Sequence, residues 1–395
     1  MKTVVVCGVG GHGQVYVREL LQYAEKYDLR WVGAVEPFPD KVSNKNDIDS
    51  AGVPWFESPE EFYCNHTADL CIISSPIAFH ASQSILALQN GSHVLCEKPV
   101  AALPSDAAAM KNARDASGKF LGIAYQWSYS DTIHRLKQDI LDGMYGKPLR
   151  LSTCYLVPRN RTYYDRGSGW AGRIKDSAGH WVLDSVANNA AAHYLHNMFF
   201  ILGGPGNSIM PDTLSAVLMR ANPIEMYDTA FLRMDWENTV ISFGATHAGE
   251  NDDGITSRFE FENGTVTYNE AGNARFTGTL RNGKTVDYGS PDKEPVKPFF
   301  KVLASLRGEK ALGFSCPVEA ALPHNRVMIA ALLSAEIGSF PEAHDDGERF
   351  FVPGLDDICR VFDHDLHLPN AQWAKPGAVI RLDDPRIDSW RGFNR

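Results

Sequence analysis

Short apolar runs alternate with segments of helical periodicity along the first third of the chain. The runs predict strands at Thr3–Cys7, Arg30–Val35, Leu70–Ser74, His93–Cys96 and Phe120–Tyr125. Between them, apolar side chains recur at helical spacing in Gln14–Lys26 and His80–Asn90, and Asn90-Gly91 supplies a helix stop. This alternation is typical of an α/β domain with a doubly wound parallel sheet.

The pattern changes from about Pro148 onward. After a helix-rich stretch at Val182–Leu202, alternating runs predict strands at Leu214–Arg220, Tyr227–Trp236, Thr239–Ala248, Ser257–Phe261, Thr265–Asn269 and Ala274–Leu280. Asn263-Gly264 and Asn282-Gly283 predict tight hairpins in which both central residues have positive φ. We therefore expect a second, α+β domain with an open, mainly antiparallel sheet. The stretch after about Arg349 is too irregular to assign.

The length and charge of the chain narrow its class. A chain of 395 residues exceeds what one hydrophobic core usually supports, so we expect two domains, at 1–124 and 125–395. The net charge of -10 is unfavourable for binding a phosphate backbone, which excludes nucleic acid as the expected partner. No apolar stretch approaches the roughly 20 residues that span a bilayer, so no membrane partner is expected.

The cysteines and the first residues bear on localisation. The seven cysteines are scattered and include no C-x-x-C pair, which indicates buried thiols in a reducing compartment. Met1–Gly8 runs directly into an apolar strand without the features of a secretory signal. Both observations predict a cytoplasmic protein.

A glycine-rich turn supplies the first candidate chemistry. Gly8-Val9-Gly10-Gly11-His12-Gly13 follows the first predicted strand and opens the first predicted helix. In such a turn Gly8 permits the reversal, Gly10 lets the backbone approach a pyrophosphate, and Gly13 allows close packing of helix on sheet. We expect a dinucleotide here; the alternative is a glycine-rich turn without a ligand.

Glu36, at the end of the second predicted strand, bears on the choice of dinucleotide. An acidic side chain there accepts hydrogen bonds from both ribose hydroxyls and repels a 2′-phosphate. NAD is therefore favoured over NADP, although Lys41 lies close in sequence, and a solvent-facing glutamate is the alternative interpretation.

Further motifs carry a family resemblance. Ser74-Ser75-Pro76, His80, Glu97-Lys98-Pro99 and Gly-Lys-Pro-Leu at Gly146–Leu149, with a looser match at Pro317–Phe340, make the chain similar to the Gfo/Idh/MocA oxidoreductases. The resemblance implies a Rossmann domain, an α/β domain whose sheet often forms the interface of a homodimer or homotetramer, and an active site between them. On the cofactor side it implies Gly8, Gly10, Gly11, His12, Gly13, Glu36, Ser75, Pro76, His80, Glu97 and Lys98.

Lys98 matches the catalytic-site lysine of that family, which hydrogen-bonds the reacting hydroxyl. Hydride transfer from a carbinol carbon requires loss of the hydroxyl proton, and a cationic donor stabilises the developing alkoxide. The family often has the bond before the equivalent of Pro99 in cis.

The second half of the site is expected within residues 181–197. The family has Asp-x-x-x-His on one helix, so that both side chains face the nicotinamide from one side. His193 matches the histidine and is the candidate general base, because its pKa lies near neutrality. Asn189 stands at the aspartate position, and Ala191 replaces a glycine. In one interpretation the nearby carboxylate of Asp184 substitutes for the aspartate; in the other, the enzyme works with a weaker base.

The resemblance also implies residues that contact a carbohydrate or cyclitol. Trp170 and Arg173 fall at the Gly167–Gly172 loop, where an aromatic face and a guanidinium suit a polyhydroxylated ring, and Trp127 is a weaker candidate. With them we group Lys98, Asp184, Asn189 and His193. His180, Asp184, His193 and His196 could instead form a metal site, but no established ligand spacing is present, and no metal is expected.

Three functions remain open from the sequence. The first is an NAD-dependent dehydrogenase that oxidises a secondary hydroxyl of a sugar, glycoside or cyclitol. The second is a redox-neutral glycosidase that keeps NAD bound and releases an aglycone without net NADH. The third is a non-catalytic sensor of NAD or sugar, which the presence of both Lys98 and His193 disfavours.

Overall fold

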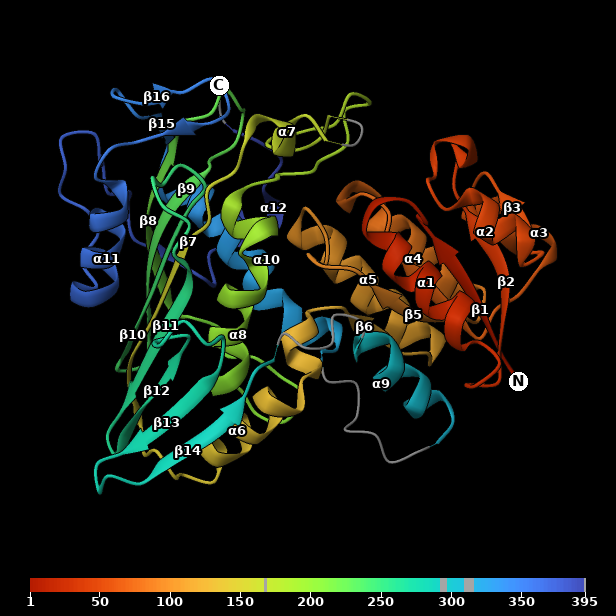
Figure 1. The fold of residues 1–395 in the computed structure, drawn as a ribbon, viewed down its shortest axis with the longest axis horizontal. Coiled ribbons are helices and arrows are strands. Elements are labelled where there is room, and N and C mark those ends of the chain that lie inside the picture. Colours follow the sequence, from red (N-terminus) through yellow and green to blue (C-terminus); the bar gives the residue numbers. More distant parts are fainter. Residues whose placement is uncertain (167–168, 292–296, 309–315, 394–395) are drawn as a thin grey trace. The chain divides into compact units, whose positions relative to one another are not determined.

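The chain folds into two domains (Figure 1), and the computed structural model describes residues 1–166, 169–291, 297–308 and 316–393. The first domain comprises Met1–Tyr129 together with the described parts of Glu294–Leu322. The second comprises the described parts of Ser130–Lys293 and Pro323–Arg395. This division differs from the predicted single boundary after residue 124, because a later segment of the chain returns to the first domain.

The first domain is built on a six-stranded parallel sheet, which confirms the predicted doubly wound α/β class. Every predicted strand is present, and the short β3 is additional. The strand order is β3-β2-β1-β4-β5-β6. The interior strands are buried on both faces, as parallel sheets are, and Val4, Val5 and Val6 have no exposed surface. The strands are β1 (Lys2–Cys7), β2 (Leu29–Val35), β3 (Trp55–Phe56), β4 (Leu70–Ile73), β5 (His93–Cys96) and β6 (Leu121–Ile123).

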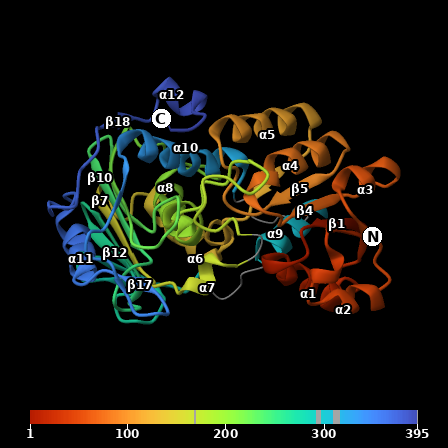
Figure 2. The same cartoon turned by 90° about the horizontal axis from the view of Figure 1, so that it is seen from above.

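Helices cover both faces of this sheet, as Figure 2 shows for α4 and α5 on one side and α1 on the other. The predicted helix stop is present, since Gly91 has a φ of 83° just after α4. The returning segment forms α9, whose Phe299 ring lies 6.3 Å from the Tyr16 ring of α1. The helices are α1 (Gln14–Tyr23), α2 (Lys45–Ser50), α3 (Pro59–Asn65), α4 (His80–Gln89), α5 (Pro104–Ser117) and α9 (Lys297–Leu306).

The second domain contains a ten-stranded sheet in which, among the described residues, all but two strand pairs are antiparallel, as predicted. The parallel pairs are β7 with β10 and β8 with β15. The path is β14-β13-β12-β11-β7-β10-β9-β8-β15, with β18 beside β8. The strands are β7 (Pro148–Leu156), β8 (Thr213–Arg220), β9 (Thr229–Trp236), β10 (Thr239–Thr246), β11 (Gly254–Phe261), β12 (Gly264–Tyr268), β13 (Phe276–Leu280), β14 (Thr285–Gly289), β15 (Ile337–Ser339) and β18 (Ile380–Arg381).

The two faces of this sheet are covered by different helices. Helices α6 (Asp131–Leu141) and α8 (Ala192–Leu202) lie on one face, and α11 (Leu355–Asp365) lies on the other (Figure 1). The segment that the sequence left unassigned thus contains α11, whose Leu355, Cys359 and Phe362 pack against the sheet. The remaining elements are α7 (Arg161–Tyr164), α10 (Val318–Ser334), α12 (Pro385–Ser389), β16 (His344–Asp345) and β17 (Phe350–Phe351).

The two predicted hairpins form, but their turns differ from the prediction. Phe261 pairs with Gly264, so Glu262 and Asn263 make the first turn, and no residue of that turn has positive φ. Gly264 is needed for another reason, since a Cβ there would lie 2.6 Å from the carbonyl oxygen of Thr279. In the second turn only Gly283 has positive φ, at 82°. The prediction that both central residues have positive φ is therefore wrong at both sites.

Candidate active site

The glycine turn between β1 and α1 is held by two very close backbone approaches. At Gly8, with a φ of 80°, a Cβ would lie 2.6 Å from the amide nitrogen of Ser75. At Gly13 a Cβ would lie 1.9 Å from the carbonyl oxygen of Gly8. Any side chain at either position would push the turn away from the ends of β1 and β4.

Gly10, in contrast, borders open space. The nearest atom to a Cβ built there is Oε2 of Glu36, at 3.9 Å. Glu36 follows β2, and its Oε1 accepts a hydrogen bond of 3.3 Å from the amide of Phe38. The turn therefore leaves a cradle over Gly10 with a carboxylate at its edge. Backbone amides beside open space suit a pyrophosphate, and the carboxylate suits the neighbouring ribose, so the residues present fit a dinucleotide.

Glu97 joins the glycine turn to the Glu-Lys-Pro segment. Its Oε1 accepts a hydrogen bond of 2.6 Å from the Tyr16 hydroxyl and lies 3.3 Å from Nε2 of His12. Burial by itself would raise the pKa of Glu97, but the hydrogen bonds and charges of His12, Tyr16 and Lys98 lower it. Glu97 is therefore an anion that orients His12 and the amide of Lys98, which donates to Oε2 at 3.2 Å. No local pattern in the sequence indicated the contact between His12 and Glu97.

The His12–Glu97 pair predicts a pH dependence of stability. The hydrogen bond to Glu97, followed by the charge of that carboxylate, raises the pKa of His12 above its ordinary 6.5. A pKa that is higher in the folded than in the unfolded state stabilises the folded state at pH values below the unfolded-state pKa. This stabilisation is lost as the pH rises through the folded-state pKa. We expect the melting temperature of the wild type to exceed that of His12→Asn at pH 6, with the difference shrinking above 6.5.

Thermal denaturation from about pH 5 to about pH 9 would measure this difference. The control repeats the comparison in a Glu97→Gln background, where the effect of His12→Asn on the melting temperature should not change with pH. A difference that is constant with pH when Glu97 is intact would contradict the pairing.

Lys98 is half-buried and is held from two sides. The bond from Lys98 to Pro99 is cis, as the resemblance implied. Behind this turn His80 is 1% exposed, with Nδ1 2.8 Å from the carbonyl oxygen of Pro99 and Nε2 3.0 Å from that of Ser75. His80 thus ties the Lys98 turn to the loop after β4. Both ring nitrogens of His80 are used in these two contacts. The Ser75 hydroxyl donates a hydrogen bond of 2.7 Å to Gln83.

The second candidate segment differs from one continuous helix. Val186–Ala190 forms a π-helical turn closed by a hydrogen bond of 2.8 Å from the Ala191 amide to the Val186 carbonyl. Helix α8 begins only at Ala192, so the prediction that Asn189 and His193 share one regular helix is wrong. Asn189 therefore lies in the wider turn and not in α8, and such turns are frequent at functional sites.

Asp184 organises the residues before this turn. Its Oδ2 accepts a hydrogen bond of 2.7 Å from the Gly172 amide, and its Oδ1 accepts one of 2.8 Å from Nδ2 of Asn189. The preceding Leu183 has a φ of 52°, an uncommon conformation for a residue with a branched side chain. Asp184 is 2% exposed, so a carboxylate does lie behind the asparagine that replaces the expected aspartate.

The residues expected to contact a carbohydrate differ in their exposure to solvent. Trp170 is half-buried, with the Arg166 guanidinium carbon 5.3 Å from its ring centre. Arg173 is exposed and pairs with Glu225 at 3.1 Å. Trp127 is 1% exposed, which is typical of a core residue. Of the predicted Gly167–Gly172 loop, residues 167 and 168 lie outside the described residues.

The histidines considered as metal ligands have other surroundings. His180 lies 3.0 Å from Asp176, and buried His196 stacks on Phe200 with ring centres 5.8 Å apart. Within the described ranges, no three His, Cys, Asp or Glu side chains are grouped as a metal site would require.

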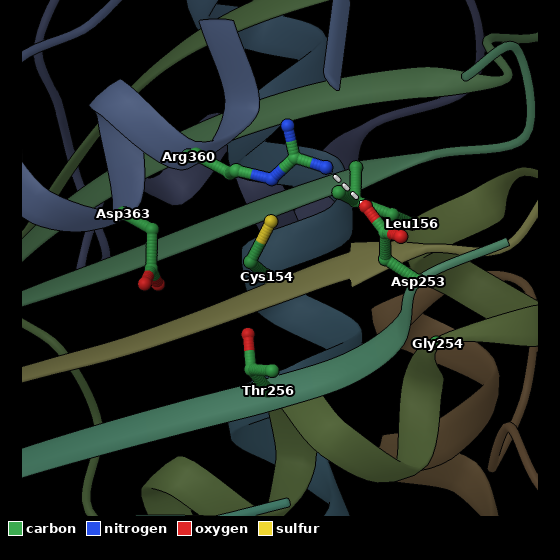
Figure 3. Close-up of a pocket in the computed structure, with 7 residues that line it drawn as sticks. All are labelled: Cys154, Leu156, Asp253, Gly254, Thr256, Arg360 and Asp363. Carbon is green, nitrogen blue, oxygen red and sulfur yellow. Dashed lines mark hydrogen bonds and ion pairs between the residues drawn. The ribbon is translucent and has the colours of Figure 1, made fainter. Parts of the chain in front are cut away.

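A hollow on the other face of the second sheet is separate from these residues. It measures about 400 Å³ and lies between α11 and the strands β7 and β11 (Figure 3). Figure 3 shows Arg360 extended toward Asp253 above Cys154 and Thr256. Arg360 also pairs with Asp357 at 2.7 Å, so its charge is balanced by carboxylates of the same chain.

Comparison with protein families agrees with this architecture. Residues 2–125 match the model described as the oxidoreductase family with an NAD-binding Rossmann fold. Residues 2–125 are thus the NAD-binding Rossmann domain of the Gfo/Idh/MocA oxidoreductases. The match ends near the last strand of the first domain, so the second domain is compared through the relatives and solved structures below.

Curated relatives match this chain over limited lengths. A 1-carboxy-3-chloro-3,4-dihydroxycyclohexa-1,5-diene dehydrogenase of Comamonas testosteroni is 30% identical over 142 residues, which cover 35% of each chain. A 1,5-anhydro-D-fructose reductase of Ensifer adhaerens is 27% identical over 136 residues, covering 34% of this chain and 39% of the relative. The chain thus spans little more than a third of the length of these relatives.

Solved structures show the same fold over a longer range. The WlbA dehydrogenase of Bordetella pertussis, in complex with NADH and UDP-GlcNAcA, has a TM-score of 0.67 at 21% identity. That likeness covers 84% of this chain and 95% of the other. This likeness shows that the chain shares the fold of that dehydrogenase. Across the part of the chain that the structure describes, we also find no helix long and apolar enough to cross a bilayer.

Proposed function

We propose that this protein is an NAD-dependent oxidoreductase that transfers hydride between a secondary hydroxyl of a sugar, glycoside or cyclitol and the nicotinamide. The observation that carries the proposal is the open cradle over Gly10 beside the Glu36 carboxylate. The family match over residues 2–125 and relatives named as dehydrogenases and reductases support it. NAD supplies the hydride acceptor when it is bound.

The residues of the chain have distinct parts in this proposal. The amides at the start of the helical segment beginning at Gly11 hold the pyrophosphate, and Glu36 accepts from the adenosine ribose. The Lys98 ammonium donates a hydrogen bond to the reacting hydroxyl and stabilises alkoxide character as the proton leaves. His193 accepts that proton, since an imidazole titrates near neutrality.

Asp184 and Asn189 act behind the proton acceptor. The carboxylate of Asp184 fixes the amide of Asn189 through the bond of 2.8 Å, so Asn189 presents its carbonyl oxygen as an acceptor away from Asp184. A neutral amide stabilises an imidazolium less than a carboxylate would.

The homodimer or homotetramer expected from the family resemblance belongs to this proposal, and light scattering tests it.

Two measurements test the function. Mass spectrometry of nucleotide released from the purified protein should identify NAD. A panel of sugars, glycosides and cyclitols followed at the NADH absorbance should then show net NADH formation with at least one of them. Aglycone release without net NADH would replace the dehydrogenase by a redox-neutral glycosidase. Absence of any dinucleotide binding would refute the proposal.

Glu36 predicts the cofactor preference. Removal of its carboxylate in Glu36→Ser removes the repulsion of a 2′-phosphate and the acceptor for the ribose. We expect the ratio of kcat/KM for NADP to that for NAD to rise by about tenfold, equivalent to about 1.4 kcal/mol. Asp40→Ser removes an equal charge four residues later and is the matched control. An equal change in both variants would show that net charge, and not the position of Glu36, sets the preference.

A further inference from the structure

Two arginines and several aromatic rings gather beyond the carboxyl ends of the parallel strands β7 and β10. Arg159 follows β7, and its amide donates a hydrogen bond of 3.1 Å to the carbonyl of His247, which follows β10. Helix α7 adds Tyr163 and Tyr164 to the same place. A hollow of about 460 Å³ lies here, lined by Pro158, Arg159, Asn160, Thr162, Tyr163 and Arg349.

The two guanidinium groups share one aromatic ring. The guanidinium carbon of Arg159 lies 4.9 Å from the centre of the Tyr163 ring, and that of Arg166 lies 3.6 Å from it. Arg159 also donates to the Tyr155 hydroxyl at 3.3 Å. These partners are neutral, so the ring orders both cations without cancelling either charge.

The two arginines of this cluster form no ion pair with a described carboxylate. Among the residues that the structure describes, neither Arg159 nor Arg166 has a carboxylate within ion-pair distance, and the buried Nε of Arg159 has no acceptor. Neighbouring Arg161 does pair with Asp345, as Arg360 pairs with Asp253 in Figure 3. In a chain with a net charge of -10, two adjacent guanidiniums without an ion-paired carboxylate are positive groups available to an anion.

His247 adds a neutral polar atom to the cluster. Its Nδ1 lies 2.9 Å from the Tyr164 hydroxyl, and the ring is 2% exposed. Burial, then the charges of Arg159 and Arg166, hold the pKa of His247 well below its usual range. Its buried Nε2 has no hydrogen-bond partner among the described residues, so one polar atom remains for a ligand.

The cluster borders the second half of the candidate active site. The ring of Tyr155, whose hydroxyl accepts the hydrogen bond from Arg159, lies 5.7 Å from the ring of Tyr194, the residue after His193. Burial, followed by the negative charge of Asp184 among other groups, raises the pKa of Tyr163 to about 12. The arginines therefore lie next to the segment that carries Asp184 and His193.

We propose that Arg159 and Arg166 bind an anionic substituent of the substrate, so that the substrate is an acidic sugar bearing a carboxylate or a phosphate. This inference rests on the proposed oxidoreductase function. Guanidinium forks match the planar geometry of both anions, and such charge-assisted hydrogen bonds are the strong ones. The Tyr163 ring pre-orders the two forks, which lowers the entropy lost on binding.

Isothermal titration with inorganic phosphate and with D-glucuronate tests the site and separates the two sources of negative charge. The wild type is compared with the double variant Arg159→Gln/Arg166→Gln, in which we expect affinity for at least one anion to fall by about tenfold or more. Loss for phosphate alone identifies a sugar phosphate, and loss for glucuronate alone identifies a sugar acid. Equal affinities of the two proteins for both anions would overturn the proposal.

Matched variants keep the result interpretable. Arg275→Gln/Arg386→Gln removes two charges from exposed ion pairs elsewhere in the second domain and should bind both anions as the wild type does. If the double glutamine variant melts early, Arg159→Lys and Arg166→Lys keep the charge but lose the fork, and each should bind several-fold more weakly. Unchanged affinity in both lysine variants would also overturn the proposal.

The same proteins distinguish this proposal from the proposed function. NADH binding, followed by fluorescence, should be equal in the wild type and the double glutamine variant. Selective loss of anion binding in a protein that binds no NADH would leave the anion site standing and remove the oxidoreductase. If the double glutamine variant binds NADH, turns over neutral sugars and binds anions as the wild type does, the oxidoreductase function stands and the anion site is refuted.

Discussion

Lys98→Ala is expected to lower turnover by about a thousandfold, within the range that a positioned proton-transfer or donor group contributes. The ammonium group of Lys98, in the Glu-Lys-Pro segment, is the proposed hydrogen-bond donor to the reacting hydroxyl, and the alanine variant lacks it. The affinity for NADH should change little, because the pyrophosphate contacts belong to the glycine turn and the ribose contact to Glu36. Steady-state kinetics on an accepted substrate and fluorescence titration of NADH measure the two effects.

Two further lysine variants define the result. Lys98→Arg keeps a cation but places a larger planar group, so turnover should remain well below the wild type. Lys111→Ala, which removes a partly exposed lysine paired with Asp115 on α5, should be fully active. Full activity of Lys98→Ala would show that the active site has been assigned to the wrong residue.

Gly13→Ala is expected to destabilise the first domain by at least about 3 kcal/mol, the cost of forcing atoms into a filled space. The new Cβ would lie 1.9 Å from the carbonyl oxygen of Gly8, and both atoms belong to backbone segments that cannot turn away as a side chain would. Helix α1 would have to move off the sheet. Thermal denaturation should show a large loss, and NADH binding should be abolished.

Gly10→Ala, three residues earlier, is the matched comparison. Its Cβ would have only Oε2 of Glu36 within 4 Å, at 3.9 Å, so stability should change by less than about 1 kcal/mol. Because the methyl group occupies the cradle, NADH affinity should nevertheless fall by about tenfold or more. If Gly10→Ala binds NADH as the wild type does, the cradle is not the pyrophosphate site.

Strands that lie within a buried sheet could be predicted closely. The run Val4–Cys7 is apolar throughout because both faces of β1 are covered, and the glycines after it mark the end of the strand. Strand β7 was missed, since Ser152 and Thr153 interrupt its apolar run although both are buried. Helix α11 was missed because only one narrow stripe, including Leu355, Cys359 and Phe362, is apolar among charged residues.

The candidate site was predictable only where its parts are adjacent in sequence. Gly8 and Gly13 have the close backbone approaches expected of the motif, because such a turn follows from local geometry. The His12–Glu97 pair depends on β1 and β5 ending at the same edge of the sheet. The arginine cluster depends on the parallel pairing of β7 with β10, which no local pattern encodes.

The return of the chain to the first domain makes that domain a discontinuous module. A fragment ending at Tyr129 would lack α9 and with it Phe299, leaving one side of the buried Tyr16 uncovered. Tyr16 is also the residue that donates to Glu97, so the missing helix supports the carboxylate indirectly. Exchanging the dinucleotide-binding module between relatives therefore requires two pieces of chain, grafted together.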